Sequence, residues 1–252
     1  MLNFVINFKN MKLHHFTFTL VASLLLACNS TAPKTQTEKH SYPDTKVVSA
    51  MKEVMWKGKL GSQIDLDSIS NTKGLYGIGP LSYLKGELLI NNGKSYVSKV
   101  TSDSTMQVVQ TYAASAPFFV YTHVNEWNEV ALPEEIKNIQ DVEQFLQRET
   151  VDLKRPFAFK LVGNVTSAKI HIQNLPKGSK VSSPEEAHRG QTNYAIQNEE
   201  VEIIGFFSTE HQGIFTHHDS FVHLHLITKD ESQMGHLDEL QIKDMKLYLP
   251  KK

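Results

Sequence analysis

The segment Phe221–Ile227 alternates apolar residues with two histidines, His223 and His225. Because successive side chains of a β-strand point to opposite faces, this pattern predicts a strand with one apolar face and one face that carries both imidazoles. The polar residues 229–235 end in glycine and are typical of a hairpin connection. His236 then opens a second expected strand, which returns beside the first. The chain is therefore constrained to an antiparallel pair of strands that brings three histidines together.

Such a cluster suits a metal ion. Six of the twelve histidines lie between positions 211 and 236. Three imidazoles on one sheet face offer a three-nitrogen site, and three protein ligands leave one position open for water or substrate, as a catalytic zinc site requires. We therefore predict that His223, His225 and His236 bind Zn²⁺. The alternative is a solvated strand face, where a chain with this many histidines often places such a pair.

Composition excludes other kinds of site. The chain has a single cysteine, Cys28, so it contains no internal disulfide and no zinc or iron–sulfur centre built from several thiolates. The formal net charge is −1, from 26 basic and 27 acidic residues. A nearly neutral chain is not held to nucleic acid by its overall field, so we expect no nucleic-acid partner.

The first part of the chain is typical of an export signal. The apolar run 20–27 is too short to span a bilayer and follows a basic head, as in a signal peptide. Leu25-Leu26-Ala27-Cys28 resembles the lipobox of bacterial lipoproteins, which predicts a signal peptide over residues 1–27 and an extracytoplasmic protein anchored to a bacterial membrane by lipid on Cys28. A plain signal peptide with an incidental cysteine is the alternative, and either Met1 or Met11 is the start.

A polar tether is expected over residues 28–46, because this stretch has too few apolar side chains to offset the entropy of ordering. The folded domain is then residues 47–252. Its pattern predicts a strand-rich α+β fold with few helices and mixed or antiparallel sheets. The expected helices are 47–58 and 139–149, the latter capped by Asn138; an Asn-Gly hairpin is expected at 91–93; and the other expected strands are 118–121, 157–161, 169–173, 201–207 and 237–242.

Several motifs in this domain resemble those of the alpha-acetolactate decarboxylase family, in the family's order. The segment 74–79 (GLYGIG), followed by Gly86-Glu87 and Gly93, is similar to a glycine-rich segment of that family. Ala116-Pro117-Phe118 and residues 201–207 (VEIIGFF) resemble two of its strands. His223-Leu224-His225 with Gly235-His236 resembles its metal motif in residue type and spacing, and this motif is the most specific of the set.

The resemblance implies an acetolactate-decarboxylase-like fold and a zinc-dependent carboxy-lyase that converts 2-acetolactate, a small-molecule oxyacid, to acetoin and CO₂. It implies that His223, His225 and His236 are the zinc ligands and that Glu87 is the acidic residue beside the metal. Without the resemblance, Glu87 would be interpreted as a surface glutamate of a hairpin. The resemblance is also compatible with a homodimer.

Two departures from the family concern catalysis. The family has an arginine on the strand where this chain has His171, and an imidazole lacks the five-donor fork of a guanidinium. We predict that His171 orients or protonates the substrate. The family's C-terminal glutamate and its Pro-Tyr-Pro segment find no match here, and Arg189 is a candidate to reach the site. We interpret His217 as a loop residue and name Asp219 as a candidate partner of the metal ligands.

Two other functions stay open on the sequence alone. The first is a different metal-dependent lyase or hydrolase acting on another oxyacid, for which the histidine at position 171 and the missing glutamate are the grounds. The second is a non-catalytic lipoprotein that keeps the fold and binds metal or a small ligand.

Overall fold

The computed structural model describes residues 44–251. The predicted signal peptide, the predicted lipidation site Cys28 and most of the predicted tether lie outside the described residues. None of the helices within 44–251 is long and apolar enough to cross a membrane.

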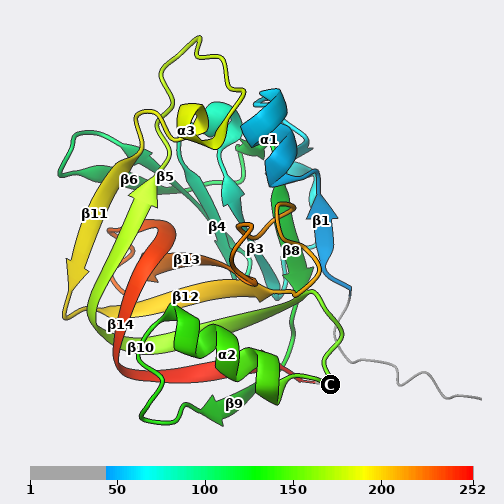
Figure 1. Ribbon diagram of the computed structural model, residues 1–252, viewed down its shortest axis with the longest axis vertical. Coiled ribbons are helices and arrows are strands. Elements are labelled where there is room, and N and C mark those ends of the chain that lie inside the picture. Colours follow the sequence, from blue (N-terminus) through cyan, green and yellow to red (C-terminus); the bar gives the residue numbers. More distant parts are fainter. Residues whose placement is uncertain (1–43, 252) are drawn as a thin grey trace, which may run out of the picture. The chain divides into compact units, whose positions relative to one another are not determined.

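The described part of the chain is dominated by strands, with three short α-helices (Figure 1). The helices are α1 (Met51–Lys57), α2 (Ile139–Glu149) and α3 (Pro184–Ala187). One sheet contains, in spatial order, β1 (Lys46–Val48), β8 (Phe119–His123), β3 (Leu75–Pro80), β4 (Glu87–Asn91), β5 (Lys94–Val100) and β6 (Met106–Gln110). The other contains β11 (Thr192–Gln197), β10 (Phe157–Ile172), β12 (Glu200–Phe207), β13 (Val222–Thr228), β14 (Met234–Pro250) and β9 (Trp127–Ala131). A minor sheet pairs β2 (Ile64–Asp65) with β7 (Ser115–Ala116).

All of these strand pairings are antiparallel. In the second sheet, β10 pairs with β14 as well as with β12, and β13 joins β12 to β14. Four strands therefore close into a ring, which removes their free edges and fixes the two ends of the histidine hairpin in place. The strand-rich α+β class predicted from the sequence is confirmed.

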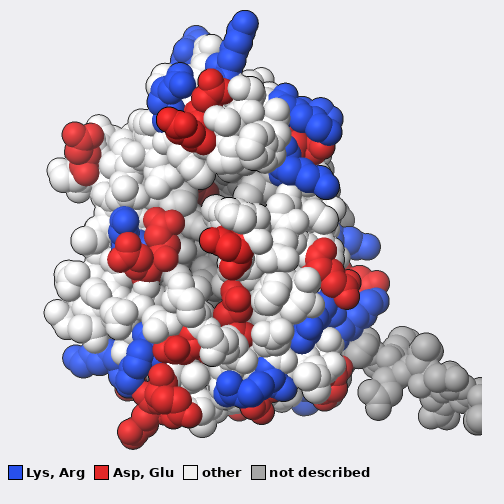
Figure 2. Space-filling view, viewed as in Figure 1, with Lys and Arg blue, Asp and Glu red and all other residues white. Residues whose placement is uncertain are grey.

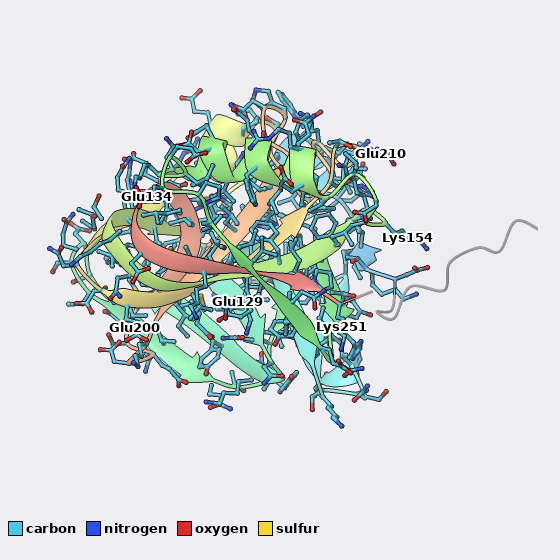
Figure 3. All side chains as sticks on the ribbon, turned by 90° about the horizontal axis from the view of Figure 1, so that it is seen from below. Glu129, Glu134, Lys154, Glu200, Glu210 and Lys251 are labelled. Atoms are coloured by element: carbon cyan, nitrogen blue, oxygen red, sulfur yellow. The ribbon has the colours of Figure 1, made fainter. Side chains whose placement is uncertain are left out.

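The two large sheets pack face to face. Tyr76, Ile78 and Leu89 of the first sheet share an apolar cluster with Ile204 and Phe206 of the second. On the other side of the second sheet, α2 buries its apolar face in the largest cluster of the domain. Figure 3 shows this order of layers, with α2 on one side of β14 and the first sheet on the other.

Local sequence signals explain several elements. Asn92 and Gly93 both adopt positive φ (48° and 81°) between β4 and β5, as a two-residue hairpin turn requires. At the start of α2 the Asn138 side chain accepts from the Asp141 N–H, and the Asp141 carboxylate accepts in return from the Asn138 N–H, which forms a capping box. Both the hairpin and the helix 139–149 are confirmed.

Other boundaries were wrong. Residues 47–48 belong to β1, so the first helix is limited to Met51–Lys57, and it ends at Gly58 with a left-handed φ of 62°. The expected strands 157–161 and 169–173 form one strand, β10, of 16 residues. The expected strand 237–242 is part of β14, which has 17 residues. β10 and β14 are long because they pair with neighbouring strands of the ring along their length. Hydrophobic periodicity within one segment does not reveal such pairing, so it does not predict the length of these strands.

Candidate functional site

The three histidines of the predicted metal site converge in the structure. His225 of β13 is the direct register partner of His236 of β14, and His223 lies on the same face two residues earlier. The ring centroid of His223 is 5.0 Å from that of His225 and 5.0 Å from that of His236, and the His225 and His236 centroids are 5.4 Å apart. One ring nitrogen from each lies within 4.8 Å of the others.

The chemistry of these nitrogens fits a bound cation. His223 and His225 are buried, with exposed fractions of 3% and 0%, yet Nδ1 of His223 and Nε2 of His225 have no hydrogen-bond partner. A buried polar atom without a partner costs about 1–3 kcal/mol, which coordination to a metal would offset. Burial lowers the pKa of His225 to about 3, and burial also sets the pKa values of His223 and His236 well below the usual range. All three rings are therefore neutral at pH 7 and have lone pairs available to a metal.

Gly235 explains why the third histidine can approach so closely. A Cβ at this position would lie 2.6 Å from the carbonyl oxygen of His171 in the neighbouring strand. Only glycine lets β14 pack against β10 at this point without displacement, and His236 is the next residue. The Gly-His pair of the motif is thus a requirement of strand packing as well as of ligand placement.

Glu87 lies beside this cluster at the start of β4. Its side chain is buried, and its Oε2 is 3.8 Å from Nε2 of His225, which is too long for a hydrogen bond. Its Oε1 accepts a hydrogen bond of 3.1 Å from the backbone N–H of Gln173. Burial raises the pKa of Glu87 well above its usual value, with a smaller contribution of the same sign from the negative charge of Asp238. Glu87 is therefore not the surface glutamate that the local sequence alone would favour.

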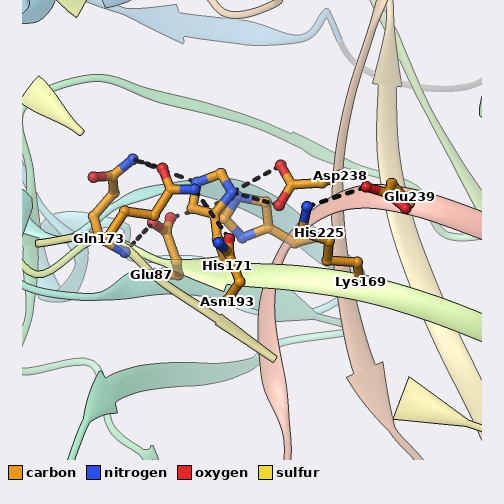
Figure 4. Close-up of polar contacts among 9 residues, drawn as sticks. Glu87, Lys169, His171, Gln173, Asn193, His225, Asp238 and Glu239 are labelled. Carbon is orange, nitrogen blue, oxygen red and sulfur yellow. Dashed lines mark hydrogen bonds and ion pairs between the residues drawn. The ribbon is translucent and has the colours of Figure 1, made fainter. Parts of the chain in front are cut away.

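His171, near the end of β10, is brought to the same site. It is the register partner of His236, and the centroids of the two rings are 4.6 Å apart. Its Nδ1 lies 2.8 and 2.9 Å from the two carboxylate oxygens of Asp238. Figure 4 shows Asp238 on one side of the His171 ring and Gln173 on the other. The predicted site residues of β4, β10, β13 and β14 are thus adjacent in space.

Four residues of the site were missed by the sequence reasoning: Gln173, His188, His217 and Asp238. The His217 ring centroid is 5.5 Å from that of His236, so His217 belongs to the site although its loop position gave no signal. His188 follows α3, and its ring lies 6.5 Å from that of His171. Burial lowers the pKa of both histidines.

Of the two weaker candidates, Arg189 was wrong and Asp219 stays a prediction. The guanidinium of Arg189 is exposed and lies 4.0 Å from the Glu186 carboxylate, so it does not reach the site. Asp219 is exposed, but it lines a pocket with His217 and His236, and its negative charge acts to raise the pKa of His217 against the larger effect of burial. The carboxylate that accepts a hydrogen bond from His171 belongs to Asp238.

The cavity at this site has two unlike walls. One is apolar and includes Met51 and Met55 of α1 with Leu84 and Phe118. The other is polar and carries Glu87, Gln173 and five histidines, which are His171, His188, His217, His223 and His236. Among the described residues, no lysine or arginine lines this cavity. In Figure 2, Asp and Glu side chains lie around the middle of the face shown, and Lys and Arg side chains lie mostly toward its edges.

Two curated proteins are similar to this chain in sequence. Alpha-acetolactate decarboxylase of Brevibacillus brevis is 25% identical over 257 residues, covering 95% of this chain and 86% of that protein. The enzyme of the same name from Methanosarcina mazei is 27% identical over 173 residues, covering 68% of this chain and 57% of that protein.

Solved structures share the fold. Alpha-acetolactate decarboxylase from Bacillus subtilis superposes with a TM-score of 0.67 at 22% identity, covering 82% of this chain and 85% of that one. A Staphylococcus aureus protein of unknown function, similar to alpha-acetolactate decarboxylase, gives a TM-score of 0.68 at 16% identity, covering 82% of this chain and 85% of that one. The profile of the alpha-acetolactate decarboxylase family matches residues 47–251, which is most of the chain. The chain belongs to the alpha-acetolactate decarboxylase family.

Proposed function

We propose that this protein decarboxylates 2-acetolactate, or a closely related 2-hydroxy-3-oxo acid, to acetoin and CO₂. The observation that carries the proposal is the convergence of three imidazoles whose nitrogens lie within 4.8 Å of one another, beside the buried carboxyl group of Glu87 and at a cavity that His223, His236 and Glu87 line. Membership of the family supports the same reaction. We propose that the ion is Zn²⁺, bound by His223, His225 and His236.

A zinc ion held by these nitrogens would supply a Lewis acid for the charge that develops on the substrate oxygens as CO₂ leaves. The protein has three further tasks. It must exclude water, place the substrate carboxylate away from the metal ligands, and return one proton to the carbon that loses CO₂.

Glu87 suits the proton step. Burial raises the pKa of its carboxyl, which favours the protonated form as a donor to the substrate inside the cavity. The backbone N–H of Gln173 fixes Oε1, which leaves Oε2 on the side of His225. His171 lines the same cavity and is placed to orient the substrate or to exchange a proton with it. The apolar wall of Met51, Met55 and Phe118 excludes water and accepts the methyl groups of such a substrate.

The test is turnover by the purified domain. Protein loaded with zinc is given acetolactate, and acetoin is measured against the spontaneous rate. We expect Glu87→Gln to lower kcat by at least about 100-fold, the usual range for loss of an acid–base group. The matched control is Glu200→Gln, whose carboxylate pairs with Lys229 at the surface. No acetoin above background, or equal rates for wild type and Glu87→Gln, would reject the proposal.

One observation favours a second candidate, a metal-dependent lyase or hydrolase for another oxyacid. The described cavity lining contains no lysine or arginine to pair with a substrate carboxylate. Turnover of a different keto or hydroxy acid by the zinc-loaded protein, with acetolactate inert, would establish this candidate. Tight zinc binding with no turnover of any acid in the panel would instead indicate a non-catalytic binding protein.

The membrane anchor is a separate proposal. We propose that lipid on Cys28 holds the domain at the outer side of a bacterial membrane, because the residues around Cys28 resemble a lipobox. Cys28→Ser should release the protein from the membrane fraction and stop its labelling by a radioactive fatty acid. A homodimer stays a prediction, which light scattering of the purified protein would test.

A further inference from the structure

Asp238 occupies an irregular position in β14. Along the pairing of β14 with β10, His236 faces His171, Leu237 faces Ile170, and Glu239 faces Lys169. Asp238 therefore has no partner in β10 and is the extra residue of a β-bulge. A bulge bends its strand and changes the direction of a side chain, and bulges are frequent next to active sites.

The result of the bulge is a close contact between a carboxylate and a site imidazole. Both oxygens of Asp238 lie within hydrogen-bond distance of Nδ1 of His171, at 2.8 and 2.9 Å. A carboxylate can only accept, so Nδ1 carries the proton and donates it. The contact is sheltered, because the His171 side chain is 7% exposed and that of Asp238 is 27% exposed.

This contact decides which edge of the ring faces the cavity. With Nδ1 directed to Asp238, the other nitrogen, Nε2, lies 3.4 Å from the side-chain Nε2 of Gln173, which also lines the cavity. The remaining neighbours of the ring are imidazoles: His236 lies at 4.6 Å and His188 at 6.5 Å between centroids. His236 and His188 contact His171 through their rings, whereas Asp238 accepts a hydrogen bond from it, so among the described neighbours Asp238 gives the ring its strongest directional contact.

We propose that Asp238 is a positioning residue that holds the His171 ring with Nε2 directed into the cavity, as the nitrogen that meets the substrate. The expected effect of Asp238 on kcat rests on the proposed function, whereas its effect on the orientation of the His171 ring does not. Carboxylates that orient an imidazole in this way are important in other sites, where their loss typically costs about 10–100-fold in activity.

A competing role for Asp238 must be separated by experiment. Donor atoms of His171, His236 and Asp238 also lie within 4.8 Å of one another and form a second group able to hold a cation. If Asp238 acted by binding metal, its replacement would change the metal content. If it acts by orienting His171, the metal content stays the same and the effect depends on His171.

The test is a double-mutant cycle on the zinc-loaded protein, with acetoin formation as the readout. We expect Asp238→Asn to lower kcat by about 10–100-fold, with KM within about threefold and zinc content unchanged. In a His171→Gln background, Asp238→Asn should change kcat by no more than about twofold. The matched control is Glu239→Gln, the exposed neighbour that pairs with Lys169, and it should behave like wild type. Independent, additive losses or a loss of zinc in Asp238→Asn would overturn the proposal.

A second readout does not depend on turnover. Nitrogen-15 NMR of the histidine side chains distinguishes a protonated Nδ1 from a bare one, and His171→Gln assigns the signal. We expect Nδ1 of His171 to be protonated in the wild type, with Nε2–H becoming populated in Asp238→Asn. The same Nδ1 protonation in both proteins would overturn the proposal. If the wild type forms no acetoin but the NMR result is as expected, the proposed function fails and the orientation of His171 stands.

Discussion

Removal of the metal should make the stability of this protein unusually sensitive to acid, and His225 allows the size of the effect to be worked out. His225 is completely buried, and its pKa is lowered from 6.5 to about 3, chiefly by burial and then by the charge of His171. In the unfolded chain the imidazole regains its ordinary pKa. Below pH 6.5 the unfolded state therefore binds a proton that the folded state does not, and the free energy of unfolding falls as the pH drops toward 3.

Each pKa unit corresponds to about 1.4 kcal/mol. Between the ordinary pKa of 6.5 and pH 5, His225 alone should thus lower the free energy of unfolding by about 2 kcal/mol. The pKa values of His223 and His236 are lowered in the same direction, so the whole cluster should cost the metal-free protein more than this. A loss of this size is a large fraction of the stability of an ordinary domain.

The assay is urea unfolding of wild type and His225→Gln in the presence of a chelator, at pH 7 and at pH 5. We expect the wild type to lose about 2 kcal/mol more than the variant between the two pH values. His218→Gln, at an exposed position in the 211–221 loop, is the control and should keep the wild-type pH dependence. The reasoning is refuted if His225→Gln loses as much stability as the wild type does.

Three further predictions concern the same region. In the metal-free protein, the raised pKa of Glu87 means that the folded state keeps a proton that the unfolded state releases above about pH 4.5, so this carboxyl opposes the gain in stability that the histidines give as the pH rises; urea unfolding at pH 5 and pH 7 should therefore show a smaller gain for the wild type than for Glu87→Gln. Gly235→Ala would place a Cβ 2.6 Å from the His171 carbonyl oxygen, so it should lower the free energy of unfolding by about 1–3 kcal/mol and weaken zinc binding measured by calorimetry. Gly61→Ala, whose Cβ would have its nearest contact at 3.8 Å, is the control and should be nearly neutral. Asn138→Ala removes a helix cap and should lower the free energy of unfolding by about 1 kcal/mol without changing the zinc content.

The part of the site that could be predicted is the part encoded by local patterns. Alternation of apolar residues with His223 and His225 specifies both a strand and a shared face, and the glycine before His236 marks the return of the hairpin. These signals lie within about fifteen residues, so few alternatives compete with them. The capping of α2 by Asn138 is predictable for the same reason, since the helix and its cap are adjacent in sequence.

Glu87 illustrates a residue that periodicity could not place. It begins a short strand before an Asn-Gly turn, which locally favours a solvent-exposed hairpin. Its burial comes from the second sheet, because the backbone N–H of Gln173, 86 residues later, contacts its carboxylate. Only the resemblance to a family gave a reason to select it from the sequence.

Asp238 was missed for a different cause, the pairing of β10 with β14. Strict alternation along β14 would put Asp238 on the same face as His236 but would not predict which β10 residue it contacts. The register shift between Lys169 and Ile170 decides this, and it inserts Asp238 beside His171. A register shift depends on two long strands closing a ring, so no single segment records it. His171, the position at which the sequence departs from its family, is thus also the position where the structure supplies an unexpected partner. A variant that moves the bulge by one residue should separate the Asp238 carboxylate from the His171 ring and leave His223, His225 and His236 unchanged.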